Sequence, residues 1–218
     1  MKKALVAATL FLLASCTPAV SVTPQLVKVY ITSAASSKMA DLYNCSAPAT
    51  AIYLSDPGTA QLTLRLGQPN PLTSPAYQVG TDEVDVIVQS QNSVDKLTAD
   101  QVYSIFLGQV TSWKDVGGSD TPVQVWTYAQ GEDIQEIFEQ NAMDGQRVTS
   151  SARLAVSAQN MLDSVTKNSG SIGFLPHSLE TTDVRDVDTV ASAPLLVITK
   201  SQPDPGIKEL VACLQGQK

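Results

Sequence analysis

Residues 97–118, LTADQVYSIFLGQVTSWKDVGG, contain a complete helix signal and the turn that follows it. Thr98 is a good N-cap residue, and Gln101 stands three positions later, where a capping box has Glu or Gln. Gly108 is a typical helix-ending residue. We therefore predict a helix over residues 99–107. Three apolar side chains recur on one face of this helix: Val102, Ile105 and Phe106.

Segments with strand and helix patterns alternate on both sides of this helix. Strands are predicted over residues 26–31, 51–54, 83–89, 123–128, 171–175 and 194–199. Further helices are predicted over residues 37–44, 133–142, 150–167 and 205–215. Residues 59–66 are ambiguous, because their period-2 pattern suits a strand while the flanking Pro-Gly and Gly67 suit a helix, which we favour. The alternation predicts an α/β layer architecture.

The same stretch carries a family resemblance. Residues 97–118 resemble the segment L-T-x-x-Q-L-x-x-I-F-x-G-x-I-x-x-W, followed by an acidic residue and Gly-Gly, of the phosphate-binding solute receptors of ABC transporters. Residues 169–174, SGSIGF, resemble the P-G-A-I-G-Y strand of those receptors. The resemblance implies an α/β, two-lobed type 2 periplasmic-binding-protein fold, each lobe a small sheet flanked by helices. Lobe 1 would comprise residues 24–88 and 179–218, and lobe 2 residues 89–178.

Composition excludes some functions. The 218-residue chain has a net charge of -7, which disfavours nucleic acid as a partner. The chain has one histidine, His177, and we find no nucleophile elbow, Cys-His pair or metal-binding His cluster. We therefore expect no enzyme, no cofactor and no metal, with His177 as a surface loop residue.

The N-terminus has the pattern of an export signal. Lys2 and Lys3 precede an apolar run over residues 4–14 that is too short to span a bilayer. Leu-Ala-Ser then stands directly before Cys16, as in the bacterial lipobox. We predict a signal peptide over residues 1–15, acylation of Cys16, and a tether over residues 16–23. The protein would lie on the outer face of the cytoplasmic membrane or on its periplasmic side. An ordinary secretory signal is the alternative.

The remaining cysteines form an even pair. The chain has three cysteines, and assigning Cys16 to a lipid leaves Cys45 and Cys213. In an oxidising compartment these two could form a disulfide, which the chain-entropy model values at about 4–5 kcal/mol for so long a loop. The alternative is two separate buried thiols. The resemblance places both cysteines in lobe 1, which favours their pairing.

The resemblance also implies a ligand site between the lobes, at helix N-termini. In lobe 1 the corresponding turn contains Thr32, Ser33 and Ala34, although simple N-capping would also explain the hydroxyls. Asp56 is a weaker candidate because Asp-Pro-Gly is also a good turn. In lobe 2 the implied ligand residues are Thr127, Tyr128, Gln130, Gly131 and Glu132.

Lobe 2 departs from the receptor pattern at the residues that hold phosphate. The receptors have an Arg near this strand end and Ser-Gly-Thr at the helix start, whereas this chain has Thr127 or Tyr128 near the Arg position and Gln130-Gly131-Glu132 at the helix start. Glu132 and Asp133 would repel a phosphate dianion, by about 3 kcal/mol per like-charge pair at about 5 Å and an effective dielectric of about 20. Acids in a first helical turn also stabilise the helix dipole, which would explain them without any ligand.

Two functions therefore stay open. The first is a lipid-anchored solute receptor that serves an ABC permease; its ligand would be an oxyanion by family resemblance, or a neutral or cationic solute by local chemistry. The second is an accessory or interaction lipoprotein that has kept the fold and lost solute binding.

Overall fold

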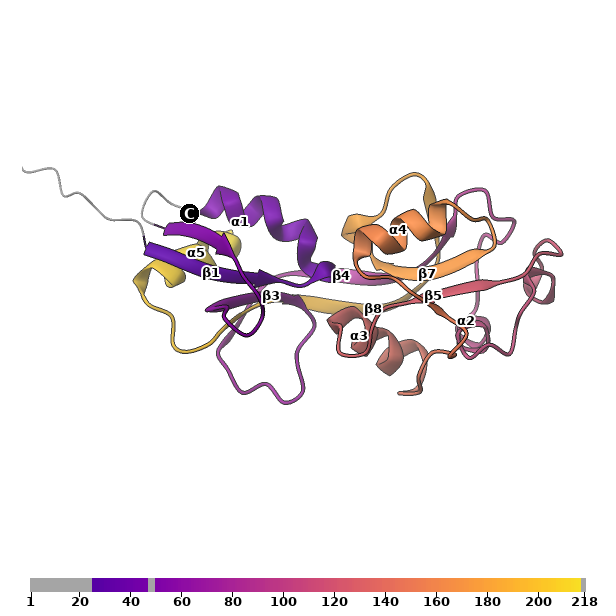
Figure 1. Ribbon diagram of the computed structural model, residues 1–218, viewed down its shortest axis with the longest axis horizontal. Helices are drawn as coiled ribbons and strands as arrows, with labels where there is room; N and C mark the ends of the chain where they lie inside the picture. Colours follow the sequence, from indigo (N-terminus) through magenta and orange to yellow (C-terminus); the bar gives the residue numbers. More distant parts are fainter. Residues whose placement is uncertain (1–24, 47–49, 217–218) are drawn as a thin grey trace, which may run out of the picture.

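A computed structural model describes residues 25–46 and 50–216 (Figure 1). They form one eight-stranded mixed sheet in the order β2-β1-β3-β8-β4-β7-β5-β6. The strands are β1 (Gln25–Ile31), β2 (Thr50–Leu54), β3 (Leu62–Leu66), β4 (Ala76–Gln89), β5 (Gln124–Thr127), β6 (Arg153–Leu154), β7 (Ser171–Pro176) and β8 (Val184–Thr199). The predicted α/β class is confirmed.

Helices cover the sheet in two groups, one at each end of the elongated molecule in Figure 1. The α-helices are α1 (Met39–Cys45), α2 (Ala99–Phe106), α3 (Asp133–Ala142), α4 (Ala158–Thr166) and α5 (Pro205–Leu214). Short 3-10 helices are η1 (Ser33–Lys38), η2 (Trp113–Val116) and η3 (His177–Leu179). We call β1–β3, η1, α1 and α5 lobe 1, and β5–β7 with α2–α4 lobe 2; the residue limits of the lobes stay a prediction.

The two long strands β4 and β8 connect the lobes. They pair antiparallel from Ala76–Ile198 to Gln89–Val184, with register shifts along the ladder. One end of this ladder meets β3 through β8, and the other meets β7 through β4. The sequence located only the apolar segments of these strands, over residues 83–89 and 194–199. The chain therefore crosses twice between the lobes, as the two-lobed fold requires.

Two predicted elements need correction. Residues 59–66 are not helical: β3 buries Leu62, Leu64 and Leu66 on one face and pairs with β1 and β8, so the helix prediction was wrong. The helix predicted over 150–167 begins only at α4, because Ser157 caps it by accepting a hydrogen bond from the amide of Asn160. The residues before that cap include β6, which pairs with β5.

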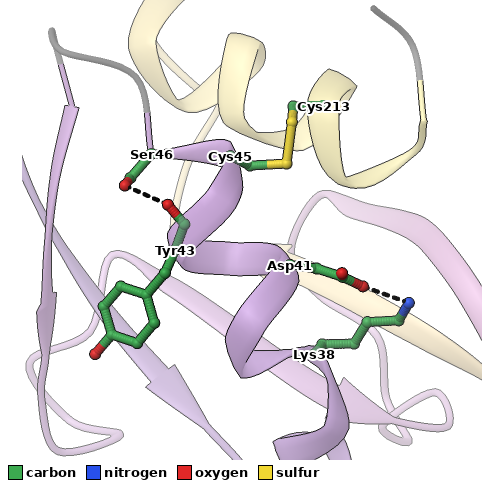
Figure 2. The surroundings of a disulfide bond; sticks show 6 residues. All are labelled: Lys38, Asp41, Tyr43, Cys45, Ser46 and Cys213. Atoms are coloured by element: carbon green, nitrogen blue, oxygen red, sulfur yellow. Dashed lines mark hydrogen bonds and ion pairs between the residues drawn. A yellow bond between two sulfur atoms is a disulfide. The ribbon is translucent and has the colours of Figure 1, made fainter.

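A disulfide joins the two helices of lobe 1. Cys45 at the end of α1 bonds to Cys213 near the end of α5, and their Cα atoms lie 5.7 Å apart (Figure 2). The predicted pairing is confirmed. Cys16 and the signal segment lie outside the described residues. Within residues 25–46 and 50–216, no helix is long and apolar enough to cross a bilayer.

Candidate functional site

A carboxylate from lobe 2 lies between the lobes. Asp133, the first residue of α3, is only 3% exposed. Its Oδ2 accepts hydrogen bonds from the Thr32 hydroxyl at 2.7 Å and from the Leu66 amide at 2.8 Å. Thr32 follows β1 and Leu66 ends β3, so both donors come from lobe 1. The cleft donors that would suit an anion thus hold an anionic group of the chain itself.

A second inter-lobe hydrogen bond uses the N-terminus of α4. The amide of Ala158 donates to the hydroxyl of Ser33 at 2.5 Å. Helix N-terminal amides are common anion donors, and here a lobe 1 side chain satisfies one of them. Ala34 follows Ser33 in η1 and is buried. Of the lobe 1 residues predicted for the site, Thr32 and Ser33 therefore lie at the lobe interface, where both bond to groups of lobe 2.

At the end of strand β5 in lobe 2, the polar groups are engaged by a side chain of the same lobe. Thr127 and Tyr128 are buried, and both donate to Oε1 of Gln135: the Thr127 hydroxyl at 2.7 Å and the Tyr128 amide at 2.9 Å. The Tyr128 hydroxyl donates to the carbonyl of Phe174. The buried amide of Gln135 thus engages the two donors that the resemblance implied for a ligand.

The turn before α3 is more open. Gly131 adopts a φ of 91°, a left-handed conformation that glycine tolerates without strain, and Gln130 donates to Glu139 at 2.8 Å. Glu132 is half-buried and is the N-cap residue of α3, without a side-chain capping bond. Of the predicted lobe 2 residues, these three lie nearest to solvent.

The electrostatics of the turn oppose an anionic guest. Burial raises the pKa of the Glu132 carboxyl, and the neighbouring Asp133 raises it further. Burial also raises the pKa of Tyr128, again with contributions from Asp133 and Glu132. Both shifts have the sign expected near negative charge.

Asp56 lies elsewhere. It is exposed in the turn after β2 and lines, with Lys28 and Tyr53, a shallow depression on lobe 1. Residues that line this depression are separate from those that bond across the lobes. The structure therefore does not bring Asp56 together with Thr32, Ser33 and Asp133.

Sequence reasoning missed three groups of this site. It recognised Asp133 as a repulsive charge, yet did not place it on lobe 1 donors. The Leu66 amide and the side chain of Gln135 were not considered. The only local signal was an acid at a helix start, which is common for reasons of helix stability alone.

A polar pocket of about 390 Å³ lies beside the Asp133 contact. Its lining includes Arg65, which lies 3.4 Å from Glu136 across the lobes. Glu139 and Gln140 of α3 and Gln68 and Asn70 of lobe 1 complete most of the wall. The pocket thus offers amide groups from both lobes and carboxylates from α3.

Comparisons with known proteins agree on the architecture. The phosphate-binding protein PstS of Staphylococcus epidermidis is 28% identical over 105 residues, which are 47% of this chain and 32% of that protein, so the match spans about a third of its length. A putative phosphate ABC transporter substrate-binding protein with bound phosphate from Clostridium perfringens superposes with a TM-score of 0.80 at 17% identity, over 87% of this chain and 93% of that one.

Two further structures show the breadth of the fold. An ABC-type phosphate transport receptor from Vibrio cholerae gives a TM-score of 0.65 at 22% identity, over 87% of this chain and 93% of that one. The reduced OxyR regulatory domain from Pseudomonas aeruginosa gives a TM-score of 0.58 at 10% identity, over 87% of this chain and 97% of that one. The type 2 periplasmic-binding-protein fold is thereby confirmed. Residues 74–210 match the PBP superfamily domain, and the chain belongs to that superfamily of substrate-binding folds.

Proposed function

We propose that this chain is an exported accessory lipoprotein of the PBP superfamily, anchored through acylated Cys16, whose cleft does not carry phosphate. The observation that supports this proposal is the buried Asp133 carboxylate, which accepts hydrogen bonds from Thr32 and Leu66. An anion in the same position would have to displace this carboxylate and then remain near it and Glu132.

The energies favour the internal carboxylate. Each like-charge pair at about 5 Å costs about 3 kcal/mol at an effective dielectric of about 20. A hydrogen bond to a charged group contributes about 1.5–3 kcal/mol, so one repulsive neighbour offsets one or two donors. The internal group also binds without the loss of translational freedom that a free solute incurs.

The fold alone does not decide between transport and another role. Superposable structures include both a phosphate transport receptor and a regulatory domain. The function therefore has to be argued from the site. A site with its lobe 1 donors already engaged favours an accessory or interaction protein.

A solute receptor is the second candidate, favoured by the polar pocket beside Asp133. Glu136 and Glu139 line that pocket, and carboxylates suit a cationic, amine-bearing solute. Arg65 lies 3.4 Å from Glu136 and would have to be accommodated or displaced. In this case the protein would deliver such a solute to an ABC permease.

A thermal-shift screen distinguishes the two candidates. Purified protein is heated with phosphate, sulfate, sugars or small amines, since a ligand that binds only the folded state raises the melting temperature. We expect phosphate to produce no saturable rise. A saturable rise with amines would favour the receptor candidate, and one with phosphate would refute the proposal that the cleft does not carry phosphate.

Replacing Asp133 by serine tests the cause of the exclusion. Removing one repulsive charge should strengthen phosphate binding about 100-fold, measured by calorimetry. Asp133→Asn keeps an acceptor without the charge and should show an intermediate gain. Asp100→Ser, at the first turn of α2, is the matched control for loss of one helix-start acid and should change nothing. Equal phosphate affinity in all three variants would disprove the role of Asp133.

The lipid anchor has its own test. Metabolic labelling with a fatty acid should mark the wild-type protein in the membrane fraction. Cys16→Ser should lose the label and shift the protein to the soluble exported fraction. Labelling that persists in this variant would show that Cys16 is not the acylated residue.

A further inference from the structure

A cluster of potential metal ligands lies where β4 passes β7, outside the inter-lobe contact. One ligand atom each from Glu83, Asp85 and His177 lies within 4.8 Å of the others. Nδ1 of His177 is 2.7 Å from Oδ2 of Asp85 and 3.9 Å from Oε2 of Glu180. Three side chains therefore converge within 4.8 Å, and the carboxyl of Glu180 lies next to the imidazole.

The register of the sheet explains this convergence. Glu83 and Asp85 are two residues apart on β4, so they share a face. Val84 pairs with Pro176 of β7, and His177 follows directly in η3. Glu180 is the C-cap residue of η3, three positions after His177. Two short segments, distant in sequence, thus supply all four groups.

The cluster lacks enough donors for its acceptors. Oε1 of Glu180 is buried and accepts no hydrogen bond from any described residue. Asp85 has a side chain that is only 1% exposed. One imidazole is the basic partner of these carboxylates in the cluster. Buried acceptors without donors are costly, and a cation is one way to satisfy them.

Surrounding groups hold the ligands in place. The hydroxyl of Thr189 donates to Oδ1 of Asp85 at 2.6 Å, which leaves Oδ2 directed at His177. Asp82 accepts hydrogen bonds from the amide and the hydroxyl of Ser178, which fixes the turn next to His177. Such outer contacts orient metal ligands in known sites.

We propose that His177, Asp85, Glu83 and Glu180 form a binding site for a divalent transition metal ion of the Zn²⁺ type. One imidazole nitrogen and carboxylate oxygens are ligands that Zn²⁺ accepts in tetrahedral geometry. Bonds of about 2.0–2.1 Å put two tetrahedral ligand atoms roughly 3.3 Å apart, so His177 and Asp85 need separate only slightly. The side chain of His177 is 59% exposed, which gives an ion access and the ring freedom to adjust.

The composition of the chain makes this site easy to test. His177 is the single histidine, and Cys45 and Cys213 are joined in a disulfide. In protein purified without an affinity tag, a histidine-bound metal signal therefore reports on His177. Zn²⁺ is titrated calorimetrically, Co²⁺ absorbance reports the coordination, and the imidazole proton resonances show whether the ring binds.

We expect one saturable Zn²⁺ equivalent, with a shifted imidazole resonance and a higher melting temperature. His177→Ala and Glu180→Gln should each weaken binding at least about 10-fold, by analogy with known ligand and outer-shell losses. Asp100→Asn, an exposed acid on α2, is the control and should bind normally. No saturable binding, or binding that survives His177→Ala, would overturn the site. If His177→Ala weakened Zn²⁺ binding and Glu180→Gln did not, Glu180 would not be a ligand and the proposed set of four ligands would be wrong.

Discussion

Single side chains separate this protein from the phosphate receptors it resembles. The departures at Gln130 and Glu132 were visible in the sequence, and they predicted a poor anion site. The location of Asp133 on the donors of Thr32 and Leu66 was not visible, because it depends on contacts between segments 67 to 101 residues apart. Local residue chemistry was therefore predictable, and the identity of each partner was not.

The hydroxyl of Thr32 should stabilise the folded protein. Thr32→Val leaves the buried Asp133 carboxylate without one of its donors, which should lower the free energy of unfolding by about 1–3 kcal/mol. Urea denaturation measures the change. Thr59→Val is the matched control, because that exposed hydroxyl donates only to the carbonyl of Asp56. Its loss should change the free energy of unfolding by less than about 0.5 kcal/mol. Equal losses in both variants would contradict this role of Thr32.

Elements with a strong local pattern were predicted well. The capping box of α2 is present, with Thr98 and Gln101 bonded reciprocally. Residues 59–66 were misassigned because their strand conformation depends on pairing with β1 and β8, and the local sequence does not specify that pairing. The lengths of β4 and β8 were missed for a related reason. Polar residues and register shifts interrupt their apolar runs, and only the paired partner defines their ends.

The start of α5 should give the protein a measurable sensitivity to acid. Asp204 accepts from the amide of Ile207 and from the side chain of Gln25, and the first of these bonds is the main cause of its lowered pKa. A carboxyl whose pKa is lower in the folded state than in the unfolded state stabilises the folded protein at pH values above its unfolded pKa of about 3.9. This contribution to stability is lost as the pH falls through the pKa of the folded state.

Two substitutions test that assignment by urea unfolding. Asp204→Ala should cost about 1 kcal/mol at pH 7, because the cap is lost. Asp204→Asn keeps a capping acceptor and removes the charge, so its deficit should shrink below about pH 4, where the wild-type carboxyl is protonated. A deficit that stays constant with pH would contradict the lowered pKa of Asp204.

In the molecule as a whole, side chains of the two lobes bond to one another. In addition to β4 and β8, the lobes are connected by hydrogen bonds of Asp133 with Thr32 and Leu66 and of Ser33 with Ala158, and by the ion pair of Arg65 with Glu136. A receptor that closes on its ligand by hinge motion should become more compact when the ligand arrives. A protein closed by its own side chain should not.

Small-angle X-ray scattering tests this difference. We expect the radius of gyration of the wild-type protein to be the same with and without phosphate. Asp133→Ser should enlarge it in the absence of phosphate, because two inter-lobe hydrogen bonds are lost, and phosphate should reverse the change. A wild-type protein that contracts on addition of phosphate would show that the lobes are open in solution.

The disulfide between α1 and α5 also determines how the protein would respond to mechanical force. Both ends of the described chain belong to lobe 1, on the same side of the molecule in Figure 1. Tension applied between them would pass from α1 to α5 through the bond between Cys45 and Cys213, which are separated by 168 residues in sequence. The intervening chain, with the whole of lobe 2, would bear no load. Stretching would unravel only the short terminal segments until a reductant exposed the remainder to the pull.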